Sequence, residues 1–346
     1  MKRTPVTAWL LGFVILGAGP GVIGQELQIG IIDFYGLNHV SAAQARQALT
    51  VKEGDTLSFG SSERPAFLSE SESRLSMVPG VVGVRMNVVC CDEGRAILYV
   101  GIQEDGGAVM RFRSAPDGTA RLAADVVQAG DEFSRALAAA VQRGDAAEDR
   151  TQGHALGHDP ATRAIQERFI SYARRDLPTL REVLRHSSDS SQRALAAQVL
   201  GYVTDKQAVV GDLVYGVSDP FEEVRNNAMR ALLVFAESAP TTARPVPRVP
   251  YEPFIALLNS PVWSDRNKSS GAVMVLSKNR DAELFARLRS EALRPLVEMA
   301  RWKSAGHAVA AFMILGRMAG YSDEAAQGAW NRGEREAVIS AVLNRR

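Results

Sequence analysis

The sequence predicts two structural classes in one chain: a small α+β domain in the N-terminal part, followed by an all-α array of repeated helix pairs. Alternating apolar residues over 81–91 and 95–103 predict two strands. The C-terminal half instead places apolar residues at helical spacing, most clearly over 219–239. Because a helix pair of this size cannot bury its own apolar face, it needs copies of itself on either side.

The composition is that of an ordinary globular protein. The chain has 346 residues, of which 46% are hydrophobic and 23% charged, and this length accommodates about two or three domains. The formal net charge is only +1. Proteins that bind nucleic acid usually carry a concentrated basic face, so we expect no nucleic-acid partner.

The N-terminus has the layout of a secretory signal peptide over residues 1–24. Lys2 and Arg3 precede an apolar run over 8–19, and small residues end the segment before Gln25. We therefore expect an exported protein of the periplasm or cell envelope, with no membrane insertion after cleavage. The alternative of an uncleaved anchor stays open, because the apolar run approaches the roughly 18 to 20 residues that span a bilayer.

Cys90 and Cys91 are the only two cysteines, and they are adjacent. Neighbouring side chains on a strand point to opposite faces, so a bond between these two is not expected. The interpretation is a pair of buried or partly buried thiols.

Residues 25–104 contain the elements of the α+β domain. A strand is expected over 27–34, a helix through Leu49 that begins with the capping box Ser41-Ala42-Ala43-Gln44, and a second helix over 65–77. The hairpin strands 81–91 and 95–103 follow, separated by Asp92-Glu93-Gly94. The predicted order is β-α-α-β-β.

Several short motifs of this domain resemble a POTRA domain, a module found next to outer-membrane β-barrel proteins and in some division proteins. They are the opening strand with Gly36-Leu37, Gly54 after the first helix, the run 75–81 (LSMVPGV) and the last strand ending in Glu104. The resemblance implies β-augmentation, in which an extended peptide adds to an open sheet edge. A structural domain with a covered edge is the alternative.

A connector over 105–160 is expected to be partly helical and partly Gly-rich. Its helix begins at about Asp131, and the polar stretch 144–160 is interpreted as the hinge between the two halves.

From Ala161 to the C-terminus the sequence predicts repeated helix pairs. The inner helices are expected over 193–203, 225–235, 266–276 and 308–318, and the last helix, over 334–346, fits a polar cap. Their starts lie roughly 32 to 42 residues apart. The array resembles HEAT repeats, most closely at Asp219-Pro220 followed by Val224-Arg225.

The HEAT resemblance implies a concave surface that binds a protein or peptide partner. The candidate partner-binding residues are Arg225, Asn226, Asn227, Arg230, Arg266, Asn267 and Lys268. The alternative is that these residues are solvated faces of amphipathic helices, since exposed charge is the ordinary case.

The sharpest catalytic candidate is the pair His154 and His158, four residues apart, which on a helix could hold a metal ion. Gly153 and Gly157 argue against a helix there, and Ala155 stands where HExxH needs a glutamate. The sequence therefore favours a non-enzymatic scaffold or adaptor that uses no cofactor and no metal. A metal-dependent enzyme using His154 and His158 and a membrane-anchored secretion or division component are the alternatives.

Overall fold

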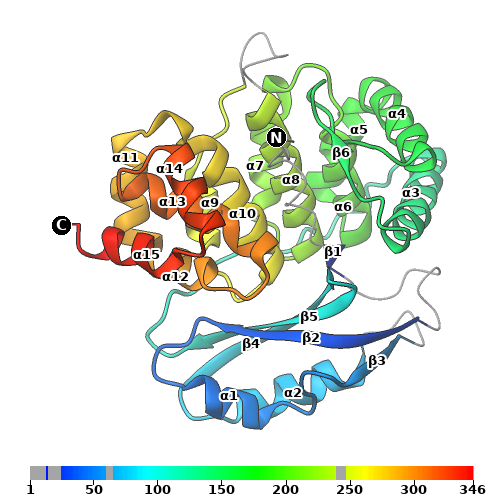
Figure 1. Ribbon diagram of the computed structural model, residues 1–346. Coiled ribbons are helices and arrows are strands. Elements are labelled where there is room, and N and C mark those ends of the chain that lie inside the picture. Colours follow the sequence, from blue (N-terminus) through cyan, green and yellow to red (C-terminus); the bar gives the residue numbers. More distant parts are fainter. Residues whose placement is uncertain (1–12, 15–24, 60–64, 239–246, 346) are drawn as a thin grey trace. The chain divides into compact units, whose positions relative to one another are not determined.

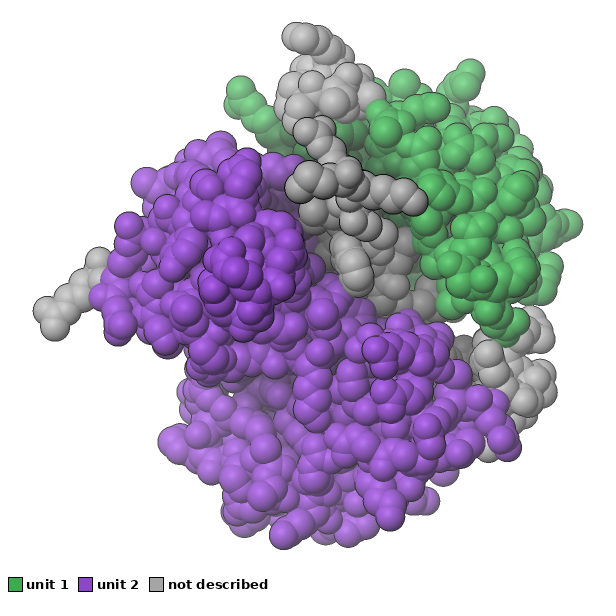
Figure 2. All heavy atoms as spheres, in the orientation of Figure 1, with its two compact units in different colours: residues 1–11, 111–253 green, residues 12–110, 254–346 purple. Residues whose placement is uncertain are grey.

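The computed structural model describes residues 13–14, 25–59, 65–238 and 247–345 (Figure 1). The chain groups into two compact units (Figure 2). One unit contains Arg111–Pro253, and the other joins Gly12–Met110 to Phe254–Arg346. The second unit thus combines an N-terminal sheet with C-terminal helices, and the helical array expected over 161–346 is divided between the two units.

The N-terminal sheet is mixed, with the strand order β1-β4-β5-β2-β3. Strands β2 and β5 pair in parallel, and the other neighbours are antiparallel. Its strands are β1 (Phe13–Val14), β2 (Gln25–Tyr35), β3 (Thr56–Phe59), β4 (Val81–Asp92) and β5 (Arg95–Glu104).

Two helices of this region match their predictions. Helix α1 (Ala42–Ala48) begins at the predicted capping box, in which the Ser41 side chain accepts from the Gln44 N–H and the Gln44 side chain accepts from the Ser41 N–H. Helix α2 (Ala66–Ser76) lies within the predicted range. An α+β sheet followed by a mostly helical region is therefore confirmed.

The predicted order β-α-α-β-β is wrong in one respect, because it lacks β3. Thr56–Phe59 pairs with the first residues of β2 and places Leu57 opposite Leu27. Leu57 is buried, so this four-residue segment belongs to the domain core. Its polar neighbours and short length gave it the pattern of a loop.

Both faces of the sheet are covered within the second unit. One face packs against α1 and α2 with apolar residues such as Met86, Leu98 and Val100. The other face carries Tyr35 and Tyr99, which contact the C-terminal helices: the Tyr35 hydroxyl donates to the Pro261 carbonyl at 2.8 Å. A sheet buried on both faces does not need the strict polar alternation of a half-exposed sheet.

The C-terminal part of the chain, from Glu252 onward, folds into α-helices. They are α9 (Glu252–Leu257), α10 (Trp263–Leu276), α11 (Ala282–Arg287), α12 (Leu293–Ala300), α13 (Ala305–Met318), α14 (Asp323–Asn331) and α15 (Arg335–Leu343). A 3-10 turn (Ser277–Asn279) follows α10, and a π-helical turn (Leu288–Ala292) joins α11 to α12. Helix α13 packs against α10, α12, α14 and α15.

The first unit is built from helix pairs. Helix α5 packs on α6, α7 packs on α8, and α6 packs on α8. The apolar stripe predicted for α8, formed by Val224, Ala228, Ala231, Leu232 and Phe235, is buried. The helices are α3 (Ala124–Gln142), α4 (Pro160–Arg175), α5 (Leu177–His186), α6 (Ser190–Leu200), α7 (Gln207–Val217) and α8 (Glu222–Ser238).

The segment interpreted as a hinge is a packed hairpin. Strands β6 (Glu148–Asp149) and β7 (Leu156–Gly157) pair antiparallel, and residues 153–157 are buried. Arg150 donates to Glu148 and to Glu237 of α8, which ties the hairpin to that helix. A segment held by buried ion pairs is not a free hinge.

The expectation of two separate thiols is also wrong. Cys90 and Cys91 form a disulfide with each other. The expectation assumed a regular strand, but the β4–β5 register shifts between Val89 and Asp92, so simple alternation does not apply there.

Within the described residues, no helix combines the length and the hydropathy that crossing a membrane requires.

Candidate functional site

The predicted binding residue Arg225 is buried, with 1% of its surface exposed. Its Nη1 donates to the carbonyl oxygens of Asp219 and Pro220 at 2.9 and 3.0 Å. Its guanidinium also lies over the Phe112 ring, 3.9 Å from the ring centre. The expectation that Arg225 stays in solvent is therefore wrong, because the side chain folds back onto the turn before its own helix.

The same contact recurs at the start of two other inner helices. Arg193 donates from Nη1 to the carbonyl of Ser187 at 2.9 Å, and Arg266 donates from Nε to that of Ser260 at 2.7 Å. Arg193, Arg225 and Arg266 each occupy the fourth position of their helix. An arginine at this position thus closes the turn between the two helices of a pair.

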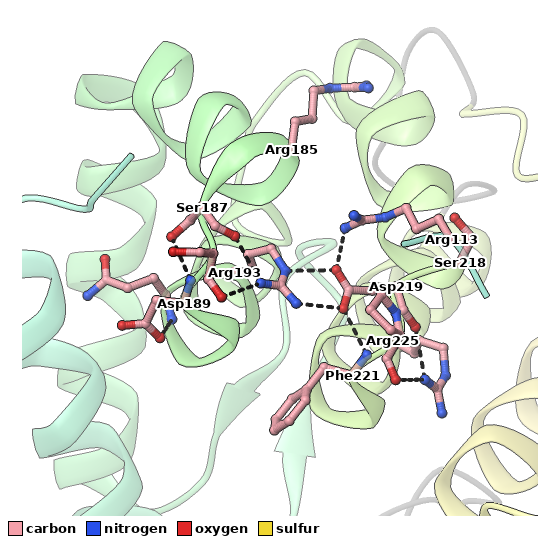
Figure 3. Close-up of polar contacts among 12 residues, drawn as sticks. Arg113, Arg185, Ser187, Asp189, Arg193, Ser218, Asp219, Phe221 and Arg225 are labelled. Atoms are coloured by element: carbon pink, nitrogen blue, oxygen red, sulfur yellow. Dashed lines mark hydrogen bonds and ion pairs between the residues drawn. The ribbon is translucent and has the colours of Figure 1, made fainter. Parts of the chain in front are cut away.

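Asp219 joins two of these turns (Figure 3). Its carboxylate accepts from Arg193 Nε and Nη2 at 2.9 and 3.0 Å, which is a bidentate pair. Arg113 forms a second ion pair with it, and the Phe221 N–H donates to it at 2.9 Å. The Asp219 side chain is fully buried. This network holds the start of α6 to the start of α8 and leaves the carboxylate no room for a ligand.

The other candidates in the first unit are half-buried and engaged. Asn227 Nδ2 donates to the Ala194 carbonyl at 3.0 Å, and Asn226 Nδ2 donates to Asn227 at 3.1 Å. Arg230 pairs with Glu148 of the hairpin.

The candidates in α10 are all buried: Arg266, Asn267 and Lys268 are 3%, 1% and 5% exposed. Arg266 pairs with Glu298 at 3.0 Å. None of the seven candidates is exposed, so the picture of a charged, solvated groove built from them is wrong. Helical periodicity shows which face of a helix is apolar, but it does not show where a long arginine side chain bends back to the backbone.

The outer edge of β4 is paired with a short strand at one end. Phe13 lies opposite Cys90 and Val14 opposite Val89, so a two-residue segment of the N-terminal apolar run forms β1 on this edge. Further along the edge, the Met86 N–H donates to Glu72 Oε1 of α2 at 2.8 Å.

The opposite side of the sheet is closed by other parts of the chain. The first four residues of β2 pair with β3. Beyond them, Lys303 Nζ donates to the Ile32 carbonyl at 2.9 Å, and the Lys303 N–H donates to Asp33 at 2.8 Å. The edge of β2 therefore offers no continuous row of backbone groups.

His154 and His158 lie on either side of β7 and differ in exposure. His154 is buried, whereas His158 is exposed. Burial, and next the charge of Lys206, lower the pKa of His154 to about 4. Asp159 caps α4 through the Thr162 N–H and pairs with Arg143. Within the described residues, no three side chains of His, Cys, Asp or Glu are grouped to hold a metal ion.

Comparison with family models, with curated proteins and with solved structures finds no match to this chain. Its function is therefore argued from its own residues.

Proposed function

We propose that the protein is a non-enzymatic scaffold or adaptor of the cell envelope that captures a protein or peptide partner by strand addition to the outer edge of β4. The observation that carries this proposal is the antiparallel pairing of Phe13–Val14 with Val89–Cys90. An apolar, extended segment already occupies one end of this edge. In strand addition the backbone hydrogen bonds supply affinity, and alternate side chains supply specificity.

The register of β1 defines where a longer strand would run. Continued antiparallel to β4, it passes Val88 and Met86 and reaches Val84. The Met86 N–H points outward, since it contacts Glu72, and by strand alternation the N–H groups of Val84 and Val88 point the same way. Removal of residues 1–24 as a signal peptide would free the positions opposite Val89 and Cys90 for a segment of another protein.

The disulfide supports the proposed compartment, and the helix pairs support the proposed scaffold. A disulfide such as Cys90–Cys91 persists in oxidising compartments, which include the periplasm. The recurring arginine in the fourth helical position supports a HEAT-like array, and the β2, α1, α2, β4 and β5 elements support a POTRA-like sheet. Such an array would act as the frame that presents the β4 edge.

The test uses the chain that begins at Gln25 and a labelled synthetic peptide with the sequence of residues 8–19, flanked by lysines for solubility. Val84→Pro removes one outward N–H, while the matched control Val84→Ala keeps it. We expect Val84→Pro to weaken peptide binding about tenfold, which corresponds to one lost hydrogen bond. Val84→Ala should stay near the parent affinity.

Two further peptides of this sequence are N-methylated at every second amide, and their methylated positions are offset by one residue. One of them should bind, because its methyl groups point away from β4, and the other should not. Equal binding by Val84→Pro and Val84→Ala, or by both methylated peptides, would contradict strand addition. Analysis of the N-terminus in native envelope fractions distinguishes a free adaptor from a membrane-anchored component. A chain that begins at Gln25 supports the free adaptor, and a chain that keeps residues 1–24 supports the anchored component.

A further inference from the structure

The Cys90–Cys91 disulfide lies on the edge of β4 that strand addition would use. Cys90 is opposite Phe13 of β1, and Val89 is opposite Val14. The bond joins two neighbouring residues, so both sulfur atoms lie at one place along this edge. A strand added in the register of β1 therefore runs past a chemically reactive group.

The two cysteines lie in a β-bulge of β4. Val89 is opposite Ile97 and Asp92 is opposite Arg95, so two residues of β4 face only Ala96 of β5. A bulge of this kind interrupts the regular alternation of side chains and changes their direction. Adjacent cysteines can therefore meet here, although neighbours on a regular strand point to opposite faces.

The two residues of the disulfide differ in exposure. Cys91 is exposed, whereas Cys90 is half-buried. A thiolate attacks a disulfide at a sulfur that it can reach, and access is one of the factors that set the rate of exchange. We therefore expect an incoming thiolate to attack Cys91 and to release Cys90.

The register of β1 identifies the residue of an added strand that meets Cys91. In an antiparallel pair, the position before the one opposite Cys90 lies opposite Cys91. In the peptide of residues 8–19 this position is Gly12. Directly opposite residues have Cβ atoms about 4.5 to 5.5 Å apart, and a disulfide needs about 3.5 to 4.5 Å. A cysteine at this position would therefore reach Cys91 after a small shift of the backbone.

We propose that the Cys90–Cys91 disulfide captures a cysteine-bearing strand covalently by thiol–disulfide exchange. The capture rests on the strand addition proposed above, and it defines the partner as an extended segment with a free thiol one residue before the position opposite Cys90. The thiolate of the partner attacks the sulfur of Cys91, the bond between the two cysteines breaks, and a mixed disulfide forms with Cys91. The electron pair of the broken bond leaves on Cys90, which takes up the proton that the partner thiol lost. One disulfide and one thiol are present before and after the step, so no external oxidant or reductant is needed.

The first test uses the full chain, in which β1 itself supplies the strand. Gly12→Cys introduces a thiol at the position that the register of β1 places opposite Cys91, and Leu16→Cys introduces the same thiol where this register leads to Asn87. Both chains are kept without oxygen at about pH 8, where part of the thiol is ionised, and are then alkylated with N-ethylmaleimide. We expect peptide mapping to find Cys90 alkylated about tenfold more in Gly12→Cys than in Leu16→Cys, because the neighbouring thiol has a high effective concentration. Equal alkylation of Cys90 in the two chains would overturn the proposal.

The second test measures capture between molecules, with the chain that begins at Gln25 and the peptide of residues 8–19. By mass spectrometry of the intact chain, the Gly12→Cys peptide should form a mixed disulfide about tenfold faster than the Leu16→Cys peptide. A Cys91→Ser chain has no disulfide to attack and should form no such product. The unsubstituted peptide separates the two proposals. If it binds but the two cysteine peptides react at equal rates, covalent capture is wrong and strand addition stands, whereas no binding by any of the three peptides would overturn both.

Discussion

Arg193, in the first turn of α6, and Asp219, in the turn before α8, form a bidentate ion pair, and both side chains are buried. Arg193 also closes its own turn through the Ser187 carbonyl. One arginine therefore serves two contacts, one within a helix pair and one to the next pair. The ion pair therefore links two successive helix pairs of the first unit.

Replacing Asp219 should be among the most damaging changes in the first unit. Asp219→Ala leaves Arg193 buried without its counter-charge, which typically costs about 3 to 5 kcal/mol of unfolding free energy. Urea unfolding followed by circular dichroism measures this cost. Asp125→Ala removes a carboxylate that pairs with Arg175 at the surface and serves as the matched control. Similar midpoints for both variants would show that the ion pair is not a structural contact.

Acidification should destabilise the protein between pH 6.5 and about 4. Burial, with a smaller contribution from Lys206 or Lys268, lowers the pKa of both His154 and His307 to about 4. In the unfolded chain both titrate near 6.5, so the unfolded state binds protons first as the pH falls. Protonation of each histidine should therefore lower the free energy of unfolding by up to about 3 kcal/mol over this pH range.

Chemical denaturation at successive pH values measures this slope. His307→Gln and His154→Gln should each flatten this slope, and His186→Gln, which replaces an exposed imidazole, serves as the surface control. A slope unchanged in both buried-histidine variants would mean that other groups control the acid transition.

The hydroxyl of Tyr99 should stabilise the packing of the sheet on the C-terminal helices. It lies 2.8 Å from His307 Nδ1, and both groups are buried. Tyr99→Phe keeps the ring contacts with Trp263 and Trp302 and should cost about 1 kcal/mol. Combining it with His307→Ala in a double-mutant cycle should give a coupling energy of similar size. Strict additivity would contradict the contact.

Two glycines should respond oppositely to alanine. A Cβ on Gly101 would lie 1.9 Å from the Pro261 carbonyl oxygen, which forces the sheet and the helix start apart. Gly101→Ala should therefore cost 3 kcal/mol or more, roughly the size of a severe overpacking defect. Gly211 lies in the interior of α7 with nothing within 4 Å of its Cβ position. Gly211→Ala should stabilise the protein by about 0.5 to 1 kcal/mol, and thermal unfolding distinguishes the two signs.

Glu72 should act as a competitor for the outer edge of β4. Its carboxylate accepts from the Met86 N–H, which an added strand would need. Glu72→Ala should therefore strengthen binding of the peptide of residues 8–19 by about threefold to tenfold. Glu70→Ala changes an exposed residue of the same helix and should leave the affinity unchanged. Weaker binding in Glu72→Ala would mean that Glu72 contacts the peptide instead.

The elements that sequence reasoning predicted well are those with long, repeated patterns. The α8 stripe from Val224 to Phe235 is buried as expected, and the capping box at Ser41 begins α1. Each of these signals is local, since it depends on residues three or four positions apart. Local patterns survive in the folded chain because tertiary packing uses the same apolar face.

The features that were missed depend on contacts between distant residues. The helical spacing of Arg225 predicts a solvent-exposed side chain, yet its guanidinium donates hydrogen bonds to the carbonyls of the preceding turn. One available signal was its recurrence: Arg193, Arg225 and Arg266 each follow a turn and sit at the same helical position. The β3 strand offered only four alternating residues, and no local pattern indicates that a hairpin over 148–157 packs on α8.

The covered second face of the sheet has a consequence for the order in which the chain matures. Tyr35 and Tyr99 are synthesised early, but the groups that satisfy them, Pro261 and His307, emerge more than two hundred residues later. Until then the growing chain carries a sheet with one bare aromatic face, a surface that favours aggregation. A chain that is exported before it folds meets this problem outside the cytoplasm. Such a chain would then depend on chaperones that cover the aromatic face of the sheet until the C-terminal helices pack on it.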